Sequence, residues 1–386
     1  MRRENYKRLG EYISPYLEKN VGLKVTLSQG INNNKYFQTP RQVAVDSEND
    51  QIVRTGQFAY NKATTRNGEK ISIAYREGPD CTVSSAYQVF YITDENKLNP
   101  HYLLMWFKRP EFDRYARFKS FGSAHEFFTW EEMCNVYLPI PSIEEQRKIV
   151  AEYQAVEQRI ENNNRLIKAL EDTAQAIYHH TFVENIDPEN LPEGWRNTSL
   201  SEICQIKGGK RLPKGEELQS EKTKHPYIKI ADMQENKYII LTSSILYVND
   251  EIQKQIKQYL VNTNDIILSI VGTIGNVNVI DESLDNANLT ENCVKIINLK
   301  NVTKQYLYHF LNSKEGQRYI EQNTVGGVQG KLPIYNIASI KIILPDKKVM
   351  DDFSAKIDSM DIYILLLMKE NEKMKEIKNL LLAKLS

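Results

Sequence analysis

The chain has 386 residues, of which 41% are apolar and 26% are charged, a composition typical of a soluble protein with two or three domains. No stretch of about 18 apolar residues exists, and the first residues lack the apolar core of a secretion signal, so we expect a cytoplasmic protein without a membrane span. Lysine plus arginine equals aspartate plus glutamate, 50 against 50, so the chain lacks the basic balance usual for DNA-binding proteins.

The cysteines predict neither a metal centre nor a disulfide framework. Cys81, Cys134, Cys204 and Cys293 are scattered, and none forms a C-x-x-C pair. Zinc sites and small disulfide-bonded domains need regular cysteine spacings. We therefore expect free thiols in a reducing compartment and no metal bound by this chain.

The first segment, residues 1–141, reads as a strand-rich domain. YQVFYI at 87–92 is typical of a short buried strand, and NNN at 32–34 and RNG at 66–68 are typical of turns. A short helix with an aromatic face is expected around 100–117.

A long helix is predicted for residues 142–182. Pro141 marks its boundary, Ser142 is a good N-cap, and Glu145 three residues on completes a capping box. Its apolar seam alternates steps of four and three residues, which is the heptad signature. The seam positions are Ile149, Tyr153, Val156, Ile160, Asn163, Ile167, Leu170, Ala174 and Ile177.

The second segment, residues 183–346, repeats this plan. Strands are predicted at 265–271, 293–299 and 339–345, a short helix at 304–321, and a second long helix at about 347–386. Tyr306-Leu307 follows Tyr102-Leu103 by 306 − 102 = 204 residues. The same offset relates Arg318-Tyr319 to Arg114-Tyr115, Gly326 to Gly122, and Pro345 to Pro141, with no gap from residue 101 to the end. RLGEYI at 8–13 also resembles SLSEIC at 199–204.

The two long helices are predicted to pack on each other. The offset transfers the seam to Phe353, Ile357, Met360, Ile364, Leu367, Asn371, Met374, Lys378 and Leu381. Two repeats related by a pseudo-twofold axis place the helices antiparallel, and we expect Asn163 and Asn371 to meet and fix the register. At about 1.5 Å per residue each helix is roughly 60 Å long. The sequence therefore predicts an α+β protein in which two strand-rich domains are separated by two long antiparallel coiled-coil helices.

Three motifs of the chain resemble those of a known family. LPEGW at 191–195, SLSEICQIKGGKRLP at 199–213 and LPIPSIEEQRKIV at 138–150 are similar to motifs of the DNA specificity subunits of type I restriction-modification enzymes. The resemblance covers essentially the whole chain, and the duplicated layout is its strongest part. Two departures are visible. LPDKKVMDDF replaces the P-x-x-E-Q run at the second helix, and the first domain lacks the P-x-G-W leader.

The resemblance implies a function without catalysis by this chain. Residues 1–141 and 183–346 correspond to target-recognition domains, each reading one half of a split double-stranded DNA site, and residues 142–182 and 347–386 to spacer helices. Two modification subunits are expected to bind S-adenosylmethionine and methylate adenine at N6. A restriction subunit using ATP and Mg can join and cut DNA, so the chain itself needs no cofactor. Because about 34–36 Å make one duplex turn, helices of this length predict a fixed gap of unread base pairs, and longer helices a longer gap.

Sequence-specific DNA binding needs cations for phosphates and planar polar groups for base edges. In the second domain KGGKRLPK at 207–214 offers glycines for close backbone approach, and GTIGN at 272–276 offers polar side chains. The first-domain counterpart of GTIGN is KATTRNG at 62–68. RFKSFGSAHEF at 117–127 and EQNTVGGVQGK at 321–331 form a third pair. The candidate DNA contacts are Lys62, Thr64, Thr65, Arg66, Asn67, Lys119, Ser123, His125, Lys207, Lys210, Arg211, Lys214, Thr273, Asn276, Gln329 and Lys331. Each of these segments also fits a plain polar turn.

Two rival functions stay open. Asn99-Pro100-His101-Tyr102 resembles the N-P-P-Y motif of amino-methyltransferases, although His101 replaces a proline, and Pro79-Asp80 with Glu95-Asn96-Lys97 resembles a metal-dependent nuclease core. GGVQGKL at 326–332 lacks the spacing of a phosphate-binding loop. A coiled-coil scaffold without a DNA role would explain the helices, but not two polar, glycine-bearing domains in matching places.

Overall fold

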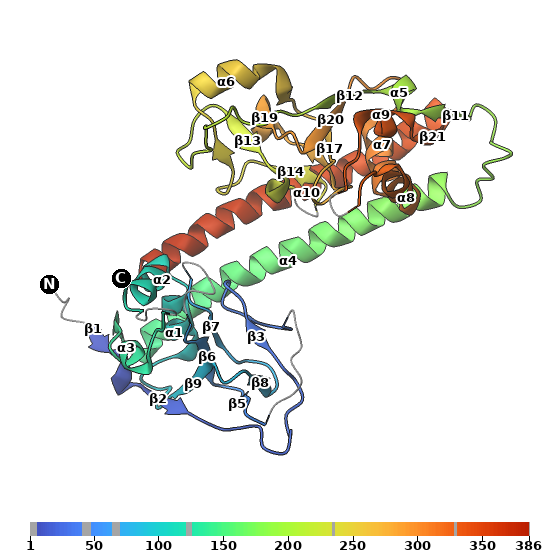
Figure 1. The fold of residues 1–386 in the computed structure, drawn as a ribbon. Helices are drawn as coiled ribbons and strands as arrows, with labels where there is room; N and C mark the ends of the chain where they lie inside the picture. The colour runs from blue at the N-terminus through green and yellow to red at the C-terminus, as the bar shows by residue number, and fades with distance from the viewer. Residues whose placement is uncertain are drawn as a thin grey trace. The chain divides into compact units, whose positions relative to one another are not determined.

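The computed structural model describes residues 6–40, 48–63, 70–120, 126–233, 236–327 and 330–385. The chain forms two compact units: unit 1 comprises Met1–Gln158 with Met374–Ser386, and unit 2 comprises Arg159–Lys373. Each unit therefore contains a part of both long helices, α4 (Ile143–Phe182) and α10 (Lys347–Ala383) (Figure 1). No helix among the described residues combines the length and the apolar character needed to cross a membrane.

Unit 1 is built on a four-stranded antiparallel sheet with the order β2-β9-β6-β7. An aromatic core lies against it, in which the rings of Phe58 and Phe90 stack at 5.1 Å and Phe107 lies edge-on to both. The strands are β1 (Tyr6–Arg8), β2 (Ile13–Tyr16), β3 (Gly30–Ile31), β4 (Phe37–Gln38), β5 (Gln51–Val53), β6 (Phe58–Asn61), β7 (Ile73–Tyr75), β8 (Cys81–Val83), β9 (Tyr87–Ile92) and β10 (Tyr137–Pro139), and the short helices are α1 (Pro100–Phe107), α2 (Pro110–Phe118) and α3 (Trp130–Cys134).

Unit 2 is built on a five-stranded sheet with the order β12-β20-β17-β18-β14, beside a four-stranded sheet with the order β15-β13-β19-β16. The strands are β11 (Arg196–Ser199), β12 (Gln205–Gly208), β13 (Pro226–Ile228), β14 (Tyr238–Ile239), β15 (Leu246–Tyr247), β16 (Leu260–Val261), β17 (Ile266–Ser269), β18 (Val277–Ile280), β19 (Ala287–Leu289), β20 (Cys293–Ile297) and β21 (Lys341–Leu344). The short helices are α5 (Leu200–Ile203), α6 (Asp250–Ile256), α7 (Lys304–Asn312), α8 (Lys314–Asn323) and α9 (Ile334–Ser339).

The repeat found in the sequence is also a repeat of structure. Helices α1, α2, α3 and α4 begin at residues 100, 110, 130 and 143, and α7, α8, α9 and α10 begin 204 residues later, at 304, 314, 334 and 347. The strand order β2-β9-β6-β7 in unit 1 matches β12-β20-β17-β18 in unit 2. A bridge between Ala63 and Phe127 in unit 1 has its counterpart between Val271 and Lys331 in unit 2. The predicted α+β class with an internal repeat is confirmed.

The short helix predicted at the end of each domain is in fact two helices. In unit 1 the break falls at Arg109, which is extended because Pro110 follows it and begins α2. In unit 2 Ser313 is extended and its side chain accepts a hydrogen bond from the Gly316 N–H, so it caps α8. A Cβ on Gly316 would lie 2.0 Å from the Phe310 carbonyl oxygen, so the tight turn between the helices requires glycine.

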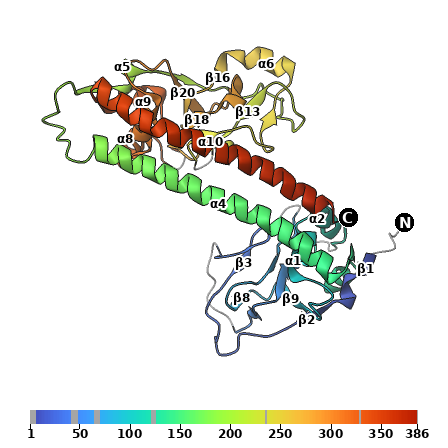
Figure 2. The ribbon, with the colours of Figure 1, turned by 180° about the vertical axis from the view of Figure 1, so that it is seen from behind.

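The predicted seam of the long helices is confirmed, since every seam position on α4 and α10 is buried or half-buried. In unit 2 Asn163 contacts Asn371 at one end, and the rings of Phe182 and Phe353 meet at the other, 5.0 Å apart. Between these two contacts the residue numbers rise along α4 and fall along α10, so the helices are antiparallel. Figure 2 shows them side by side. In unit 1 Glu157 on α4 pairs with Lys378 on α10 at 2.9 Å.

Candidate nucleic-acid interface

The candidate segments of unit 2 follow strands that end at one edge of the five-stranded sheet. Gly208 at the end of β12 pairs with Val294, and Ser269 at the end of β17 pairs with Cys293. Leu268 pairs with Val277 at the start of β18. The registers therefore bring KGGKRLPK, GTIGN and the turn before β20 to the same edge, so three segments far apart in sequence form one polar surface.

Backbone bonds fix the KGGKRLPK segment on this edge. The Gly209 N–H donates to the Cys293 carbonyl, and the Lys210 N–H donates to the Leu289 carbonyl. A Cβ on Gly209 would lie 2.0 Å from the Thr290 carbonyl oxygen, so the chain's own backbone requires this glycine. The proposed role of Gly209 in close approach to a phosphate is therefore unnecessary to explain the residue.

The cations of this segment remain at the surface. Arg211 is 79% exposed and its Nε lies 2.6 Å from the Glu291 carboxylate, while the Lys210 ammonium lies 5.5 Å from the centre of the Tyr259 ring. Lys207 and Lys214 are exposed. A partly restrained guanidinium at a protein surface can exchange its carboxylate partner for a phosphate or a guanine edge.

The GTIGN segment is a tight loop held from two sides. The Ser269 hydroxyl donates to the Thr273 carbonyl and accepts from the Asn276 N–H, at 2.6 and 2.9 Å. Gln317 on α8 donates to the Gly275 carbonyl at 3.0 Å. Lys331 lies beside this loop, because its backbone bridges to Val271, and its side chain is exposed. Thr273, Asn276 and Lys331 therefore lie together, while Gln329 lies outside the described residues.

In unit 1 the corresponding edge carries Lys62. It follows β6, its N–H donates to the Ala86 carbonyl, and its carbonyl accepts from the Phe128 N–H. Lys119 ends α2 and lies 3.4 Å from the Glu132 carboxylate. Thr64, Thr65, Arg66, Asn67, Ser123 and His125 lie outside the described residues.

A groove beside Lys62 was missed by the sequence analysis. It has a volume of about 670 Å³, and its lining holds two lysines, three amides and no carboxylate: Pro15, Tyr16, Leu17, Lys19, Asn49, Gln51, Lys62, Ser85 and Gln88. Lysines and amides are the groups that bind guanine and adenine edges. These residues come from four separate segments, so no local pattern could have united them.

The long helices anchor unit 2 through a buried ion pair. Lys237, which precedes β14, lies 2.7 Å from Asp361 on α10, and both side chains are almost fully buried. Its backbone N–H donates to Glu171 on α4 at 2.7 Å. Burial lowers the pKa of Lys237 although Asp361 opposes that shift. Burial also raises the pKa of Glu171, to about 6. One residue thus joins the sheet to both helices.

The motifs behind the rival functions have structural roles here. The Asn99 side chain caps α1 by accepting from the His101 and Tyr102 N–H groups, and Pro100 opens the helix. The Asp80 carboxylate accepts from the Arg54 guanidinium at 2.6 Å and from the Thr55 N–H at 2.9 Å. Helix capping accounts for Asn99 and Pro100, and an ion pair accounts for Asp80.

Comparison with known proteins identifies the repeat. The family model for the type I restriction modification DNA specificity domain matches the chain twice, at residues 10–172 and 192–379. The chain is 24% identical over 304 residues to the type I restriction enzyme MjaIX specificity subunit of Methanocaldococcus jannaschii, covering 74% of this chain and 67% of that protein. It is 22% identical over 406 positions to the HindI specificity subunit of Haemophilus influenzae, covering 87% and 86%.

The fold has a counterpart among solved structures. The crystal structure of the S subunit of a type I restriction-modification system from M. genitalium superposes with a TM-score of 0.56 at 14% identity, covering 100% of this chain and 97% of that one. At this identity the likeness concerns the fold alone, and it agrees with two strand-rich units sharing a pair of long helices.

Proposed function

The chain belongs to the type I restriction-modification DNA specificity family, and from this premise we propose that its two domains, residues 1–141 and 183–346, each read one half of a split DNA target. The family assignment gives the chain its role, which is sequence-specific DNA recognition. The assignment of one half-site to each domain is supported by the two matches of the family model, since each match spans most of one domain.

The observation that carries the proposal is the equivalence of the two sheet edges. In unit 2 the edge presents Lys210, Arg211, Thr273 and Lys331, and in unit 1 the matching edge presents Lys62 beside a groove of amides and lysines. A rigid sheet that positions polar loops is a favourable scaffold for reading base edges. A scaffold protein without a DNA role gives no reason for this chemistry to recur at equivalent places.

The chemistry is assigned to partners. We infer that two modification subunits bind S-adenosylmethionine and methylate adenine at N6 in each half-site, and that a restriction subunit using ATP and Mg can join them. The structural roles of Asn99 and Asp80 support a chain that selects DNA without modifying it. The net charge of zero supports a contribution of the partners to phosphate contacts.

The decisive experiment is methylated-base mapping of the source genome with and without this gene. Loss of N6-methyladenine at one split motif on deletion is the expected result, and it would reveal the target and its gap. An unchanged methylome that stays unchanged when the chain is co-expressed with modification subunits would favour the scaffold. Methylation or cleavage by the purified chain alone would favour an enzyme.

A further inference from the structure

An arginine–tyrosine pair occurs at the same place in both units and belongs to none of the candidate DNA-contact segments. Arg114-Tyr115 lies on α2 and Arg318-Tyr319 lies on α8, 204 residues apart. Both arginines are at the surface, with side chains 71% and 59% exposed. Packing in the core therefore gives no reason for an arginine to recur at this position.

Each arginine lies at the margin of a cavity. The cavity in unit 1 has a volume of about 560 Å³ and includes Pro110, Asp113 and Arg114 of α2 in its lining. The cavity in unit 2 has a volume of about 540 Å³ and includes the equivalent positions of α8, Lys314, Gln317 and Arg318. The repeat has thus placed a cavity on the same helix face in each unit.

The residue before each arginine connects its helix to the loop that carries recognition candidates. Asp113 accepts from the Ile71 N–H at 3.2 Å, at the end of the segment that joins β6 to β7. Gln317 donates to the Gly275 carbonyl at 3.0 Å, in the segment that joins β17 to β18. Arg114 and Arg318 therefore follow residues that make equivalent contacts, Asp113 with Ile71, which precedes β7, and Gln317 with the loop that contains Thr273.

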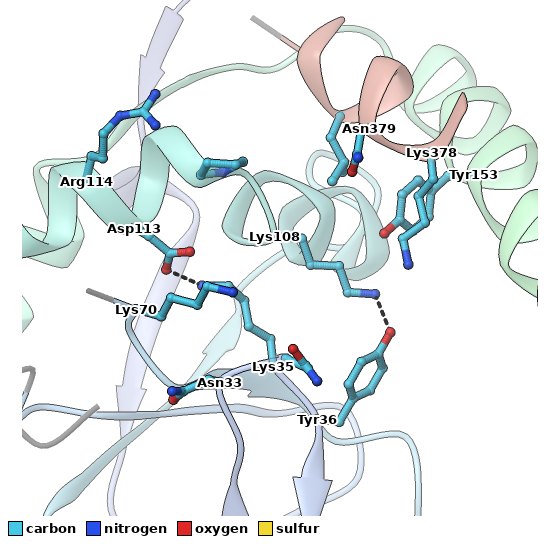
Figure 3. Close-up of a pocket in the computed structure, with 13 residues that line it drawn as sticks. Asn33, Lys35, Tyr36, Lys70, Lys108, Asp113, Arg114, Tyr153, Lys378 and Asn379 are labelled. Atoms are coloured by element: carbon cyan, nitrogen blue, oxygen red, sulfur yellow. Dashed lines mark hydrogen bonds and ion pairs between the residues drawn. The ribbon is translucent and has the colours of Figure 1, made fainter. Parts of the chain in front are cut away.

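The cavity beside Arg114 is lined by several cations. Figure 3 shows Arg114 on the helix turn that carries Asp113, with its guanidinium directed away from the four lysines of the lining, Lys35, Lys70, Lys108 and Lys378. Lys35 contacts Asp113 at 2.6 Å, and Lys108 and Lys378 contact Glu157 at 3.1 and 2.9 Å, so carboxylates neutralise part of the positive charge of this lining. In unit 2 the lining holds Lys314 and Arg318 against Glu321.

Each arginine has an exposed partner on its own helix. Arg114 lies 3.2 Å from Glu111, and Arg318 lies 3.8 Å from Glu315, again at equivalent positions. Exposed ion pairs of this kind contribute little to stability. An arginine can therefore leave its glutamate for a phosphate at small cost, and counterions released from DNA favour the exchange.

We propose that Arg114 and Arg318 are equivalent positioning residues, each of which binds one backbone phosphate of DNA beside the half-site that its unit reads. This inference rests on the proposed function and adds residues to it. Phosphate contacts set the orientation of a protein on the duplex without reading its sequence. The two arginines therefore hold the recognition loops against the groove of the DNA duplex, and base contacts come from other side chains.

The test measures the salt dependence of DNA binding by the full chain assembled with its modification subunits. Duplexes with and without the mapped motif are titrated against wild type, Arg114→Gln, Arg318→Gln and the double variant. Each single change is expected to weaken binding to both duplexes by the same factor and to reduce the slope of log K against log salt by about 1, and the double change by about 2. The methylated motif stays unchanged.

Three further variants complete the design. Arg165→Gln is the matched control, because Arg165 is 66% exposed and pairs with Glu161 on its own helix, and no change in slope is expected. Arg114→Lys keeps the charge and is expected to keep the slope. Glu315→Gln removes the competing carboxylate and is expected to strengthen binding.

The outcomes separate the inference from the proposed function. Wild type that binds its motif, with arginine variants of unaltered slope, overturns the inference and leaves the function intact. Variants that relax the motif would make the arginines base readers and also overturn it. If the assembled wild type fails to bind any duplex, the proposed function fails and the inference with it.

Discussion

Asn163 on α4 donates a hydrogen bond to Asn371 on α10, with 2.9 Å between the amide nitrogen and oxygen, and both side chains are almost fully buried. Asn163 also donates to Glu370, and Asn371 donates to Asn164, so the pair is held at both ends. In an otherwise apolar seam this pairing is satisfied in only one register. The contact therefore selects the alignment of the two helices within unit 2.

Removing one partner of this pair should destabilise unit 2. Asn163→Leu leaves the Asn371 amide buried beside an apolar side chain, and we expect a loss of about 1–3 kcal/mol in the free energy of unfolding. The double change Asn163→Leu with Asn371→Leu should recover most of that loss. Denaturant unfolding of wild type, Asn163→Leu, Asn371→Leu and the double variant gives the coupling energy, and strictly additive losses would contradict the pairing.

Gln146 gives a second prediction, because it connects α4 to the turn before α1. Its side chain accepts from the Asn99 N–H at 2.8 Å and donates to the Lys97 and Pro141 carbonyls, both at 2.9 Å. Gln146→Met should cost about 1–3 kcal/mol and speed hydrogen exchange of the Asn99 amide. Met350, the equivalent residue in unit 2, is buried, and Met350→Leu should cost less than about 1.5 kcal/mol. Equal costs at the two junctions would show that the hydrogen bonds of Gln146 contribute nothing.

Glu171 predicts a pH dependence of stability. Burial raises its pKa from 4.5 to about 6, while its hydrogen bond from the Lys237 N–H and the charge of Lys237 oppose the shift, and Asp172 and Asp361 add to it. The pKa of Glu171 is higher in the folded protein than in the unfolded chain, so the folded protein binds the proton more tightly. The contribution of Glu171 to stability is therefore complete below about pH 4.5 and is lost as the pH rises through 6. The difference amounts to about 2 kcal/mol.

The variant Glu171→Gln isolates this effect, because glutamine still accepts from Lys237 and does not titrate. Relative to wild type its free energy of unfolding should increase by about 2 kcal/mol between pH 4 and pH 7. Unfolding midpoints of both proteins at matched pH values measure this difference, in which other titrating groups cancel. A difference independent of pH would show that Glu171 titrates normally.

The sequence was sufficient for the repeat and for the helix seam because both depend on periodic apolar positions. The heptad pattern and the pseudo-twofold axis predict antiparallel helices, and the one asparagine in each seam predicts the register in which Asn163 meets Asn371. The structure also explains why the second helix junction lacks the Glu-Gln pair. Met350 is buried at the position equivalent to Gln146, where apolar packing replaces the hydrogen bonds of the glutamine.

The candidate site was less accessible to sequence reasoning, since it depends on pairing between distant strands. The sequence pattern predicts that Gly209 lets a phosphate approach the backbone. In the structure the Thr290 carbonyl lies where a Cβ at this position would be. Asn49, Gln51 and Gln88 carry no local sequence signal, because only the folded chain brings these polar side chains together in one groove. The ion pair of Lys237 with Asp361 joins residues 124 positions apart and has no local signal.

The base-reading role of the two edges can be tested by substitutions that affect one half of the target at a time. Arg211 presents a guanidinium that is 79% exposed and suited to a bidentate contact with guanine. Arg211→Ala should lower discrimination at one position of one half-site by about 1–3 kcal/mol, and Arg211→Lys should also relax it, because lysine lacks the planar fork. Lys62→Ala should affect only the other half-site.

Methylome mapping of cells that carry each variant measures both half-sites at once. Relaxation confined to one half by Arg211→Ala, and to the other half by Lys62→Ala, would assign each domain to its half-site. A uniform loss of methylation across the whole motif would instead place these residues among the phosphate contacts, since such contacts carry affinity for every sequence alike. In that case the amides of the groove beside Lys62 become the first candidates for base reading in unit 1.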